Sequence, residues 1–304
     1  MSDKPLPTFT IVTPSYNQAA FLELTIQSVL SQTYPRDKVQ FIVMDGGSTD
    51  GSVELLRRYS DSIDYWTSQP DGGQANAINQ GMARADGDIV GWLNSDDAYL
   101  PQTLANVAQI FQDARIAASC ADALHWEQST GRFYRTSNAR PSKLLLSYYG
   151  NTVAQPTCFW RKDVWVGAKG LNASLHRYLD YEFHLRLFKQ GYRYHYAPEP
   201  RAVIVWHGAN KCATLDPSQE HRALMNQYGI ASLRLQQTFG KFLIGMQHLQ
   251  PGKLEFLLGA LGARAGFSDA TRGLGRLVPD QKAAALVGPR LYDRLTPLAE
   301  KSRG

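Results

Sequence analysis

The sequence predicts an α/β protein built on a Rossmann-like, mostly parallel sheet flanked by helices, with a helical C-terminal extension. Three observations predict this fold class. In the first third of the chain, short apolar and β-rich runs alternate with stretches whose apolar residues recur at helical spacing. Polar clusters follow these runs, as expected where parallel strands end and ligands collect. From about residue 216 the chain reads as helices with Gly-rich breaks.

The first four strands can be placed from their apolar runs. The run from Val39 to Met44 is nearly continuous, which is typical of a strand buried on both faces. The expected strands span residues 9–13, 39–44, 64–67 and 89–93, and the helices between them span 21–31, a stretch through Leu55 and Leu56, and 75–85. This alternation implies right-handed crossovers between parallel strands.

The middle third is less regular. It contains an aromatic stretch at 147–151, a predicted helix at 180–189 and a predicted strand at 202–206 that ends in His207. The three cysteines, Cys120, Cys158 and Cys212, are too widely spaced for a disulfide framework or a zinc motif, and we expect buried thiols.

The composition, with 43% hydrophobic and 19% charged residues, is that of an ordinary globular protein. No apolar run approaches the roughly 20 residues that span a bilayer. The N-terminus is polar and lacks the apolar stretch of a signal peptide. These features predict a cytoplasmic protein.

The net charge of +5 is concentrated at the C-terminal end. From residue 241 onward, ten basic residues face five acidic ones. Few aromatics lie among them, which argues against nucleic acid as a partner. A solvated helical face and a peripheral contact with an anionic membrane are the two interpretations that remain open. The oligomeric state cannot be predicted.

Asp96 and Asp97 stand side by side directly after an apolar strand. Adjacent carboxylates repel each other, so the pair needs a cation or solvent. Their oxygens suit Mg²⁺ or Mn²⁺, which often share their ligands with substrate phosphates. The alternative is that Asp97 caps the next helix.

Four motifs together resemble the family 2 glycosyltransferases of the GT-A fold. They are Thr13-Pro14-Ser15-Tyr16-Asn17, Asp45-Gly46-Gly47-Ser48-Thr49-Asp50-Gly51, Gln69-Pro70-Asp71-Gly72-Gly73-Gln74 and Asn94-Ser95-Asp96-Asp97, and the likeness covers roughly residues 8–212. The resemblance implies a nucleotide-sugar-binding half over residues 1–105, an acceptor-binding half over 106–215 and an extension over 216–304.

The implied function is inverting transfer of a hexose-type sugar from a nucleoside diphosphate donor, expected to be a UDP-sugar. The implied acceptor is a saccharide or a lipid-linked saccharide in bacterial surface polysaccharide synthesis. The two alternatives are a non-catalytic nucleotide-sugar binding module and a sugar nucleotidyltransferase. A binding module without activity would not need both an acidic pair and a separate base. A sugar nucleotidyltransferase would want a basic Gly-rich loop, and residues 13–20 contain neither Lys nor Arg.

On the donor side, the resemblance assigns Pro14, Ser15, Tyr16 and Asp45 to the nucleotide base. The ring of Tyr16 would pack on the base, and Asp45 would accept the imide hydrogen of uracil. Many relatives carry a second acid after Asp45, where this chain has Gly46.

The remaining donor assignments concern the sugar, the phosphates and the metal. Asp71 and Gln74 would contact the donor, and Asp96 the ribose. Asp97 and His207 would bind Mn²⁺ or Mg²⁺, and Lys211 would reach a phosphate. For Asp71 a purely structural loop role is the alternative.

On the acceptor side, Asp180 resembles the catalytic base, which would remove the proton of the attacking hydroxyl. The usual Glu before this Asp is Leu179 here. Glu182 is the competing base and is otherwise expected to contact the acceptor. Gln155 and Trp160 also resemble acceptor-binding residues, with core packing as the alternative for Trp160.

Overall fold

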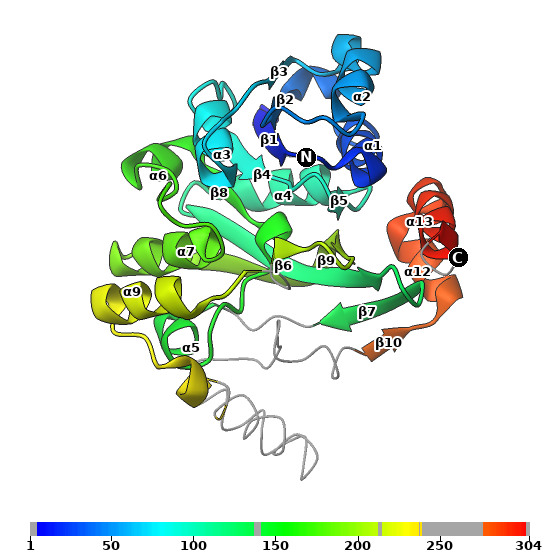
Figure 1. The fold of residues 1–304 in the computed structure, drawn as a ribbon. Coiled ribbons are helices and arrows are strands. Elements are labelled where there is room, and N and C mark those ends of the chain that lie inside the picture. The colour runs from blue at the N-terminus through cyan, green and yellow to red at the C-terminus, as the bar shows by residue number, and fades with distance from the viewer. Residues whose placement is uncertain (1–4, 137–140, 212–214, 237, 239–275, 302–304) are drawn as a thin grey trace.

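The structure is a computed structural model that describes residues 5–136, 141–211, 215–236, 238 and 276–301. Its strands form one sheet in the order β10-β7-β6-β8-β4-β1-β2-β3, and β5 and β9 join it through β6. Helices lie on both faces of this sheet (Figure 1).

The four predicted N-terminal strands are confirmed. They are β1 (Phe9–Ser15), β2 (Val39–Asp45), β3 (Tyr65–Ser68) and β4 (Ile89–Trp92). β1 pairs with β2 and β4, and β2 with β3, all in parallel. The helices between them are α1 (Ala19–Leu30), α2 (Ser52–Arg58) and α3 (Gln74–Met82), with short 3₁₀ turns at Arg36–Lys38 and Ser60–Ser62. Parallel pairing brings the carboxyl ends of these strands to one edge.

The second half of the sheet is mixed. β4 is followed by β5 (Ala98–Tyr99), α4 (Thr103–Phe111), β6 (Ala118–Glu127), β7 (Arg132–Thr136), α5 (Lys143–Tyr148), a 3₁₀ turn (Gln155–Thr157), β8 (Phe159–Arg161), α6 (Lys162–Gly167), α7 (Leu179–Lys189) and β9 (Tyr194–Trp206). β8 runs antiparallel to β4 and β6, whereas β9 runs parallel to β6. The sheet is therefore mostly parallel only in its N-terminal half.

β2 is buried on both faces, as its apolar run predicted. Ile42 and Met44 face the core under α3, α6 and α7, whereas Phe41 and Val43 face the core under α1, α2 and α4. This alternation follows from the two-residue period of a strand. Cys120 and Cys158 are buried thiols in the first core, as expected, and Cys212 lies outside the described residues.

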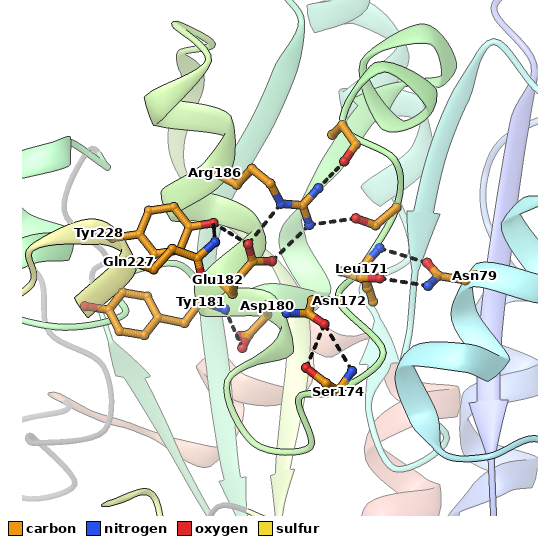
Figure 2. Close-up of polar contacts among 12 residues, drawn as sticks. Asn79, Leu171, Asn172, Ser174, Asp180, Tyr181, Glu182, Arg186, Gln227 and Tyr228 are labelled. Atoms are coloured by element: carbon orange, nitrogen blue, oxygen red, sulfur yellow. Dashed lines mark hydrogen bonds and ion pairs between the residues drawn. The ribbon is translucent and has the colours of Figure 1, made fainter. Parts of the chain in front are cut away.

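The two halves of the fold are joined by a pair of hydrogen bonds between a side chain and the backbone. The Asn79 amide in α3 donates to the Leu171 carbonyl at 2.9 Å, and its Oδ1 accepts from the Leu171 amide at 2.8 Å (Figure 2). A Cβ at Gly170 would lie 2.5 Å from Asn79 Oδ1, so this junction requires glycine next to Leu171.

The C-terminal extension packs on the rest of the chain at two places (Figure 1). Its described elements are α9 (Ser218–Tyr228), β10 (Arg276–Val278), α12 (Asp280–Val287) and α13 (Pro289–Lys301). β10 extends the sheet beside β7, so the extension is not purely helical. The apolar side of α13, including Leu291 and Leu295, lies in a core with β6, β7 and α1.

This packing bears on the expected membrane contact. The apolar stripe of α13 covers the protein's own sheet and helix α1, so it is not available to a bilayer. Five of the basic residues counted from residue 241 onward, Lys241, Lys253, Arg264, Arg272 and Arg303, lie outside the described residues. Within the described ranges, no helix combines the length and the apolar character that crossing a membrane requires.

Candidate active site

A cavity of about 540 Å³ opens at the carboxyl ends of the parallel strands. Its walls come from the turns after β1, β2, β3 and β4, from the 3₁₀ turn, from the start of α7 and from the end of β9. The sequence-predicted residues that line it are Pro14, Ser15, Tyr16, Asp71, Gln74, Asp96, Asp97, Gln155, Asp180 and Lys211. His207 does not line it directly but hydrogen-bonds to Asp96.

The turn after β1 offers an aromatic face. The side chain of Tyr16 is 62% exposed, so its ring is open to a planar ligand in the cavity. The Ser15 hydroxyl is buried and has no hydrogen-bond partner among the described residues. A ligand hydroxyl or carbonyl at this wall would satisfy it.

Asp45 is held by its own loop and does not fit the predicted base contact. Its Oδ2 accepts the Ser48 amide at 2.8 Å and the Ser68 hydroxyl at 2.7 Å, and its Oδ1 accepts the Ser48 hydroxyl at 2.6 Å. The residue is 1% exposed and does not line the cavity. Asp45 therefore shapes the loop that carries Gly46 and Gly47.

Asp71 takes the place beside Tyr16 that the sequence assigned to Asp45. Its Oδ1 accepts the Gly73 amide at 2.7 Å. Its Oδ2 lies 3.0 Å from where a Cβ on Gly46 would stand, and Tyr16 Cδ2 lies 3.3 Å from the same point. Glycine at position 46 thus leaves room for the Asp71 carboxylate next to the Tyr16 ring.

Asn94, which was not predicted as a site residue, organises the floor of the cavity. Its Oδ1 accepts from Gln74 Nε2 at 2.9 Å, and its Nδ2 donates to Gln155 Oε1 at 3.2 Å. Gln155 in turn donates to the Trp92 carbonyl at 2.9 Å. Gln155 lines the cavity, and its side-chain amide serves to hold the end of β4.

Asp97, the predicted metal ligand, lines the cavity and is nearly buried. Its Oδ1 accepts the Val205 amide at 3.2 Å, and its Oδ2 accepts from Asn94 at 3.3 Å. The Thr25 hydroxyl donates to its carbonyl at 2.7 Å. Burial, reinforced by the charge of Asp96, raises the pKa of Asp97 well above its usual range. Asp97 therefore fastens β4 to β9.

Asp96 and His207 form the better candidate for a cation site. His207 Nε2 lies 3.1 Å from Asp96 Oδ2, and the Asp96 side chain is 19% exposed. The His207 ring stacks on Phe21, with centroids 4.4 Å apart and planes at 21°. Asn210 donates to Asp96 Oδ2 at 3.3 Å and to the Val205 carbonyl at 3.0 Å, which fixes this corner.

A carboxylate and an imidazole are two suitable ligands for Mn²⁺ or Mg²⁺. Across the ranges that the structure describes, no group of three or more His, Cys, Asp or Glu side chains is placed to hold a metal ion. Two side-chain ligands are compatible with a cation that takes its remaining ligands from substrate phosphates and water, as Mg²⁺ commonly does.

Lys211 brings a positive charge to the same cavity. Its Nζ donates to Gln74 Oε1 at 2.8 Å, which joins the segment after β9 to the start of α3. The ammonium group thus stands at the cavity wall, where an anionic group such as a phosphate would be favoured.

Asp180 lies in the first turn of α7 and lines the cavity. Asn151 Nδ2 donates to Asp180 Oδ2 at 2.8 Å. The Tyr181 amide lies 2.8 Å from Asp180 Oδ1 (Figure 2). The Asn151 side chain is itself oriented, because its Oδ1 accepts the Val153 amide at 3.2 Å. The position suits a base that receives a proton from a group in the cavity.

Glu182 is not an acceptor-binding residue. Figure 2 shows its carboxylate turned toward Arg186, with a 2.9 Å ion pair, and toward the hydroxyl of Tyr228. It is 2% exposed and does not line the cavity. Residues two apart on a helix point to different sides, so Asp180 and Glu182 cannot both face the cavity.

Trp160 is also a core residue and not an acceptor platform. Its ring is fully buried and stacks on Trp92, with centroids 5.0 Å apart. Its Nε1 donates to the Tyr194 hydroxyl at 3.0 Å. His176, Arg177 and Trp206, which were not predicted as site residues, do line the cavity.

Comparison with known proteins shows the family to which the chain belongs. Residues 10–167, just over half of the chain, match the model described as Glycosyl transferase family 2. The uncharacterized glycosyltransferase Rv1514c of Mycobacterium tuberculosis is 42% identical over 93 residues, which cover 31% of this chain and 35% of that protein. TuaG of Bacillus subtilis, a glycosyltransferase assigned by its name to teichuronic acid biosynthesis, is 32% identical over 116 residues, 37% of this chain and 45% of its own. The match thus spans less than half the length of either relative.

Solved structures match over nearly the whole chain. TarS of S. aureus (residues 1–349, in complex with UDP-GlcNAc) has a TM-score of 0.58 at 14% identity, covering 97% of this chain and 91% of that one. The mannosyltransferase PcManGT from Pyrobaculum calidifontis, in complex with GDP-Man and Mn²⁺, has a TM-score of 0.55 at 19% identity, covering 99% and 90%. The chain therefore belongs to glycosyltransferase family 2 and has the GT-A fold.

Proposed function

We propose that this chain is an inverting glycosyltransferase that moves a hexose-type sugar from a nucleoside diphosphate donor to an acceptor hydroxyl. One observation carries the proposal. A single cavity is lined by Tyr16 and Asp71 as a nucleotide subsite, by Asp96, with His207 behind it, as a cation subsite, and by Asp180 as a base. Each of the three tasks of metal-assisted sugar transfer thus has a residue of suitable chemistry in one place.

The nucleotide subsite favours a base with an imide-type N–H. Uracil, thymine and guanine carry such a donor, whereas cytosine and adenine present an acceptor at that edge. The free Oδ2 of Asp71 can accept it, while the Tyr16 ring packs on the base. The bases in the two matching complexes, UDP-GlcNAc in TarS and GDP-Man in PcManGT, are both of this kind. A UDP-sugar is the expected donor.

The cation subsite would hold Mn²⁺ or Mg²⁺ through Asp96 and His207. When bound, such an ion neutralises charge on the diphosphate leaving group. Lys211 adds a positive charge at the same wall, from which it can contact a phosphate oxygen. The solved structure of PcManGT, which shares this fold, is a complex with GDP-Man and Mn²⁺.

The transfer step is a direct displacement. Asp180 accepts the proton of the acceptor hydroxyl while its oxygen attacks the anomeric carbon. The bond from that carbon to the diphosphate oxygen breaks, and the nucleoside diphosphate leaves with the bonding electrons. Attack on the face opposite the leaving group inverts the anomeric configuration, by the logic of an inverting glycosidase with a sugar hydroxyl in place of water.

The acceptor we propose is a saccharide or a lipid-linked saccharide of a bacterial surface polysaccharide. The name of TuaG supports this, since it places a relative in teichuronic acid synthesis. We propose that the protein acts in the cytoplasm or at the inner face of the membrane. Residues 1–105 would bind the donor, and residues 106–215 would bind the acceptor.

The proposal is tested by donor turnover. The full chain is incubated with UDP-, dTDP- and GDP-sugars in the presence of Mn²⁺, Mg²⁺ or EDTA, and release of the nucleoside diphosphate is measured. We expect metal-dependent release from at least one donor and its loss in Asp180→Asn, with nucleotide binding retained. Binding of the nucleotide without turnover of any donor would instead support a non-catalytic nucleotide-sugar binding module.

A further inference from the structure

Glu220 lies in α9, in the C-terminal extension, yet it binds the backbone that leads into α7. Its Oε1 accepts the His176 amide at 2.7 Å, and its Oε2 accepts the Tyr178 amide at 2.9 Å. The Arg177 amide between them lies 3.3 Å from Oε1 and 3.1 Å from Oε2. One carboxylate thus collects three successive backbone N–H groups.

These contacts hold the backbone at the entrance to α7. Tyr178 is the N-cap of α7, so Glu220 binds the N-cap amide and the two amides before it. The Tyr178 side chain makes no capping bond to α7. A carboxylate at this end is also favoured by the helix dipole, and hydrogen bonds to a charged acceptor are the stronger kind. Glu220 therefore fixes where α7 begins.

The turn that Glu220 fixes carries cavity residues. Asp180 is the second residue of α7, and His176, Arg177 and Leu179 line the cavity beside it. Another restraint on Asp180 is the Asn151 amide, which orients its carboxylate. Asn151 sets the rotamer of Asp180, whereas Glu220 sets the backbone from which that side chain projects.

We infer that Glu220 is a positioning residue for Asp180, so that the C-terminal extension completes the acceptor side of the active site. The inference rests on the proposed function, in which Asp180 is the base. Glu220 itself does not line the cavity, so it acts through the first turn of α7 and not by touching substrate.

A matched control separates positioning from simple docking of α9. The far end of α9 also contacts α7, through the Tyr228 hydroxyl and the Glu182 carboxylate. Tyr228→Phe removes that bond and leaves the start of α7 untouched. Glu54→Gln, in an exposed ion pair on α2, repeats the chemical change of Glu220→Gln away from the cavity.

The experiment compares wild type, Glu220→Gln, Tyr228→Phe and Glu54→Gln as full chains. Hydrolysis of the panel donor that turns over fastest gives kcat and KM, UDP binding is measured by titration calorimetry, and amide hydrogen exchange is followed in the peptide 175–183. Asp180→Asn is run in parallel and reports on the proposed function alone.

We expect Glu220→Gln to lower kcat about tenfold, with KM and UDP affinity within about twofold of wild type, because small misplacements of a catalytic group are costly. Exchange in the peptide should be faster, and both controls should behave as wild type. Wild-type exchange in Glu220→Gln would overturn the inference whatever the activity. An unchanged kcat with faster exchange would overturn it as well, as would an equal loss of kcat in Tyr228→Phe.

Discussion

The Oδ2 atom of Asp96 and the Nε2 atom of His207 lie 3.1 Å apart, although 111 positions of the chain separate the two residues. β9, which pairs with β5 and β6, ends one residue before His207 and brings it to the end of β4. The pair places a carboxylate and an imidazole together, and it is the cation site that we propose.

The first prediction follows from this pair. Asp96→Asn and His207→Ala should each lower metal-stimulated turnover by about 100-fold, the scale of losing one electrostatic stabiliser of a leaving group. Mn²⁺ affinity, measured by titration in the presence of UDP, should fall with it.

Asp97→Asn is the informative comparison. It exchanges one acceptor for a donor at a buried site that binds the Val205 amide, so we expect it to reduce stability by about 1–3 kcal/mol. Chemical denaturation measures this. If Asp97→Asn were as stable as wild type but no longer bound Mn²⁺, Asp97 would be the metal ligand, as the sequence predicted.

The second prediction concerns the choice of nucleotide base. Asp71→Asn should weaken UDP binding about tenfold, or about 1.4 kcal/mol, because its side chain loses a charged acceptor next to Tyr16. CDP, which has no imide hydrogen, should bind wild type weakly and lose little in the variant. Asp45→Asn should instead lower thermal stability, because its loop loses a buried acceptor. If Asp71→Asn lost equal affinity for UDP and for CDP, the carboxylate would not discriminate between the two bases.

The sequence predicted the first half of the fold well because that half is encoded locally. Apolar runs and helical spacing located β1 to β4 to within two residues at each end. The strands of the antiparallel half were harder to predict from the sequence. β8 has three residues, and its place between β4 and β6 depends on pairings that no local pattern records.

The site was predicted as a set of motifs, but individual roles depended on contacts distant in sequence. Asp96 and Asp97 are adjacent and identical in type, so the sequence cannot show that Asp97 is the one that is buried and bound to the Val205 amide. The sequence alone does not show that the Asp45 carboxylate accepts a hydrogen bond from Ser68 on the neighbouring strand. Glu182 could have been separated from Asp180 by helical spacing alone.

The third prediction links the C-terminal helices to the cation site. Phe21 stacks on His207 and also lies in the core that holds α12 and α13. Phe21→Ala should therefore weaken Mn²⁺ binding several-fold, and Leu295→Ala in α13 should do so to a smaller degree. Mn²⁺ titration by electron paramagnetic resonance measures both without relying on activity. Phe133→Ala, in the same core but away from His207, serves as a control for general loosening.

The fourth prediction separates packing from sugar binding at Trp160. Trp160→Ala should destabilise the protein by about 3–5 kcal/mol, as is typical of removing a fully buried aromatic side chain. Trp160→Phe should recover much of the stability and keep donor hydrolysis, although the Tyr194 hydroxyl loses its donor. A stable Trp160→Phe variant with normal donor hydrolysis but no transfer to an acceptor would show that Trp160 binds the acceptor.

The fifth prediction is a pH dependence of stability that arises away from the cavity. His184 is fully buried in α7, and burial lowers its pKa from 6.5 to about 3. Its Nδ1 lies 2.7 Å from the Tyr194 hydroxyl, which already accepts a hydrogen bond from Trp160, so the ring is neutral and accepts at Nδ1. Between these two pKa values the unfolded chain binds a proton that the folded chain does not.

The free energy of unfolding should therefore fall as the pH drops below about 6.5, by up to about 1.4 kcal/mol per pH unit from this residue, and the loss should level off near pH 3. Urea denaturation at pH 7, 6 and 5 tests it. His184→Phe should show a slope smaller by about one proton's contribution, and His176→Phe, at an exposed position, should keep the wild-type slope. The same slope in wild type and His184→Phe would mean that the histidine takes up its proton without unfolding.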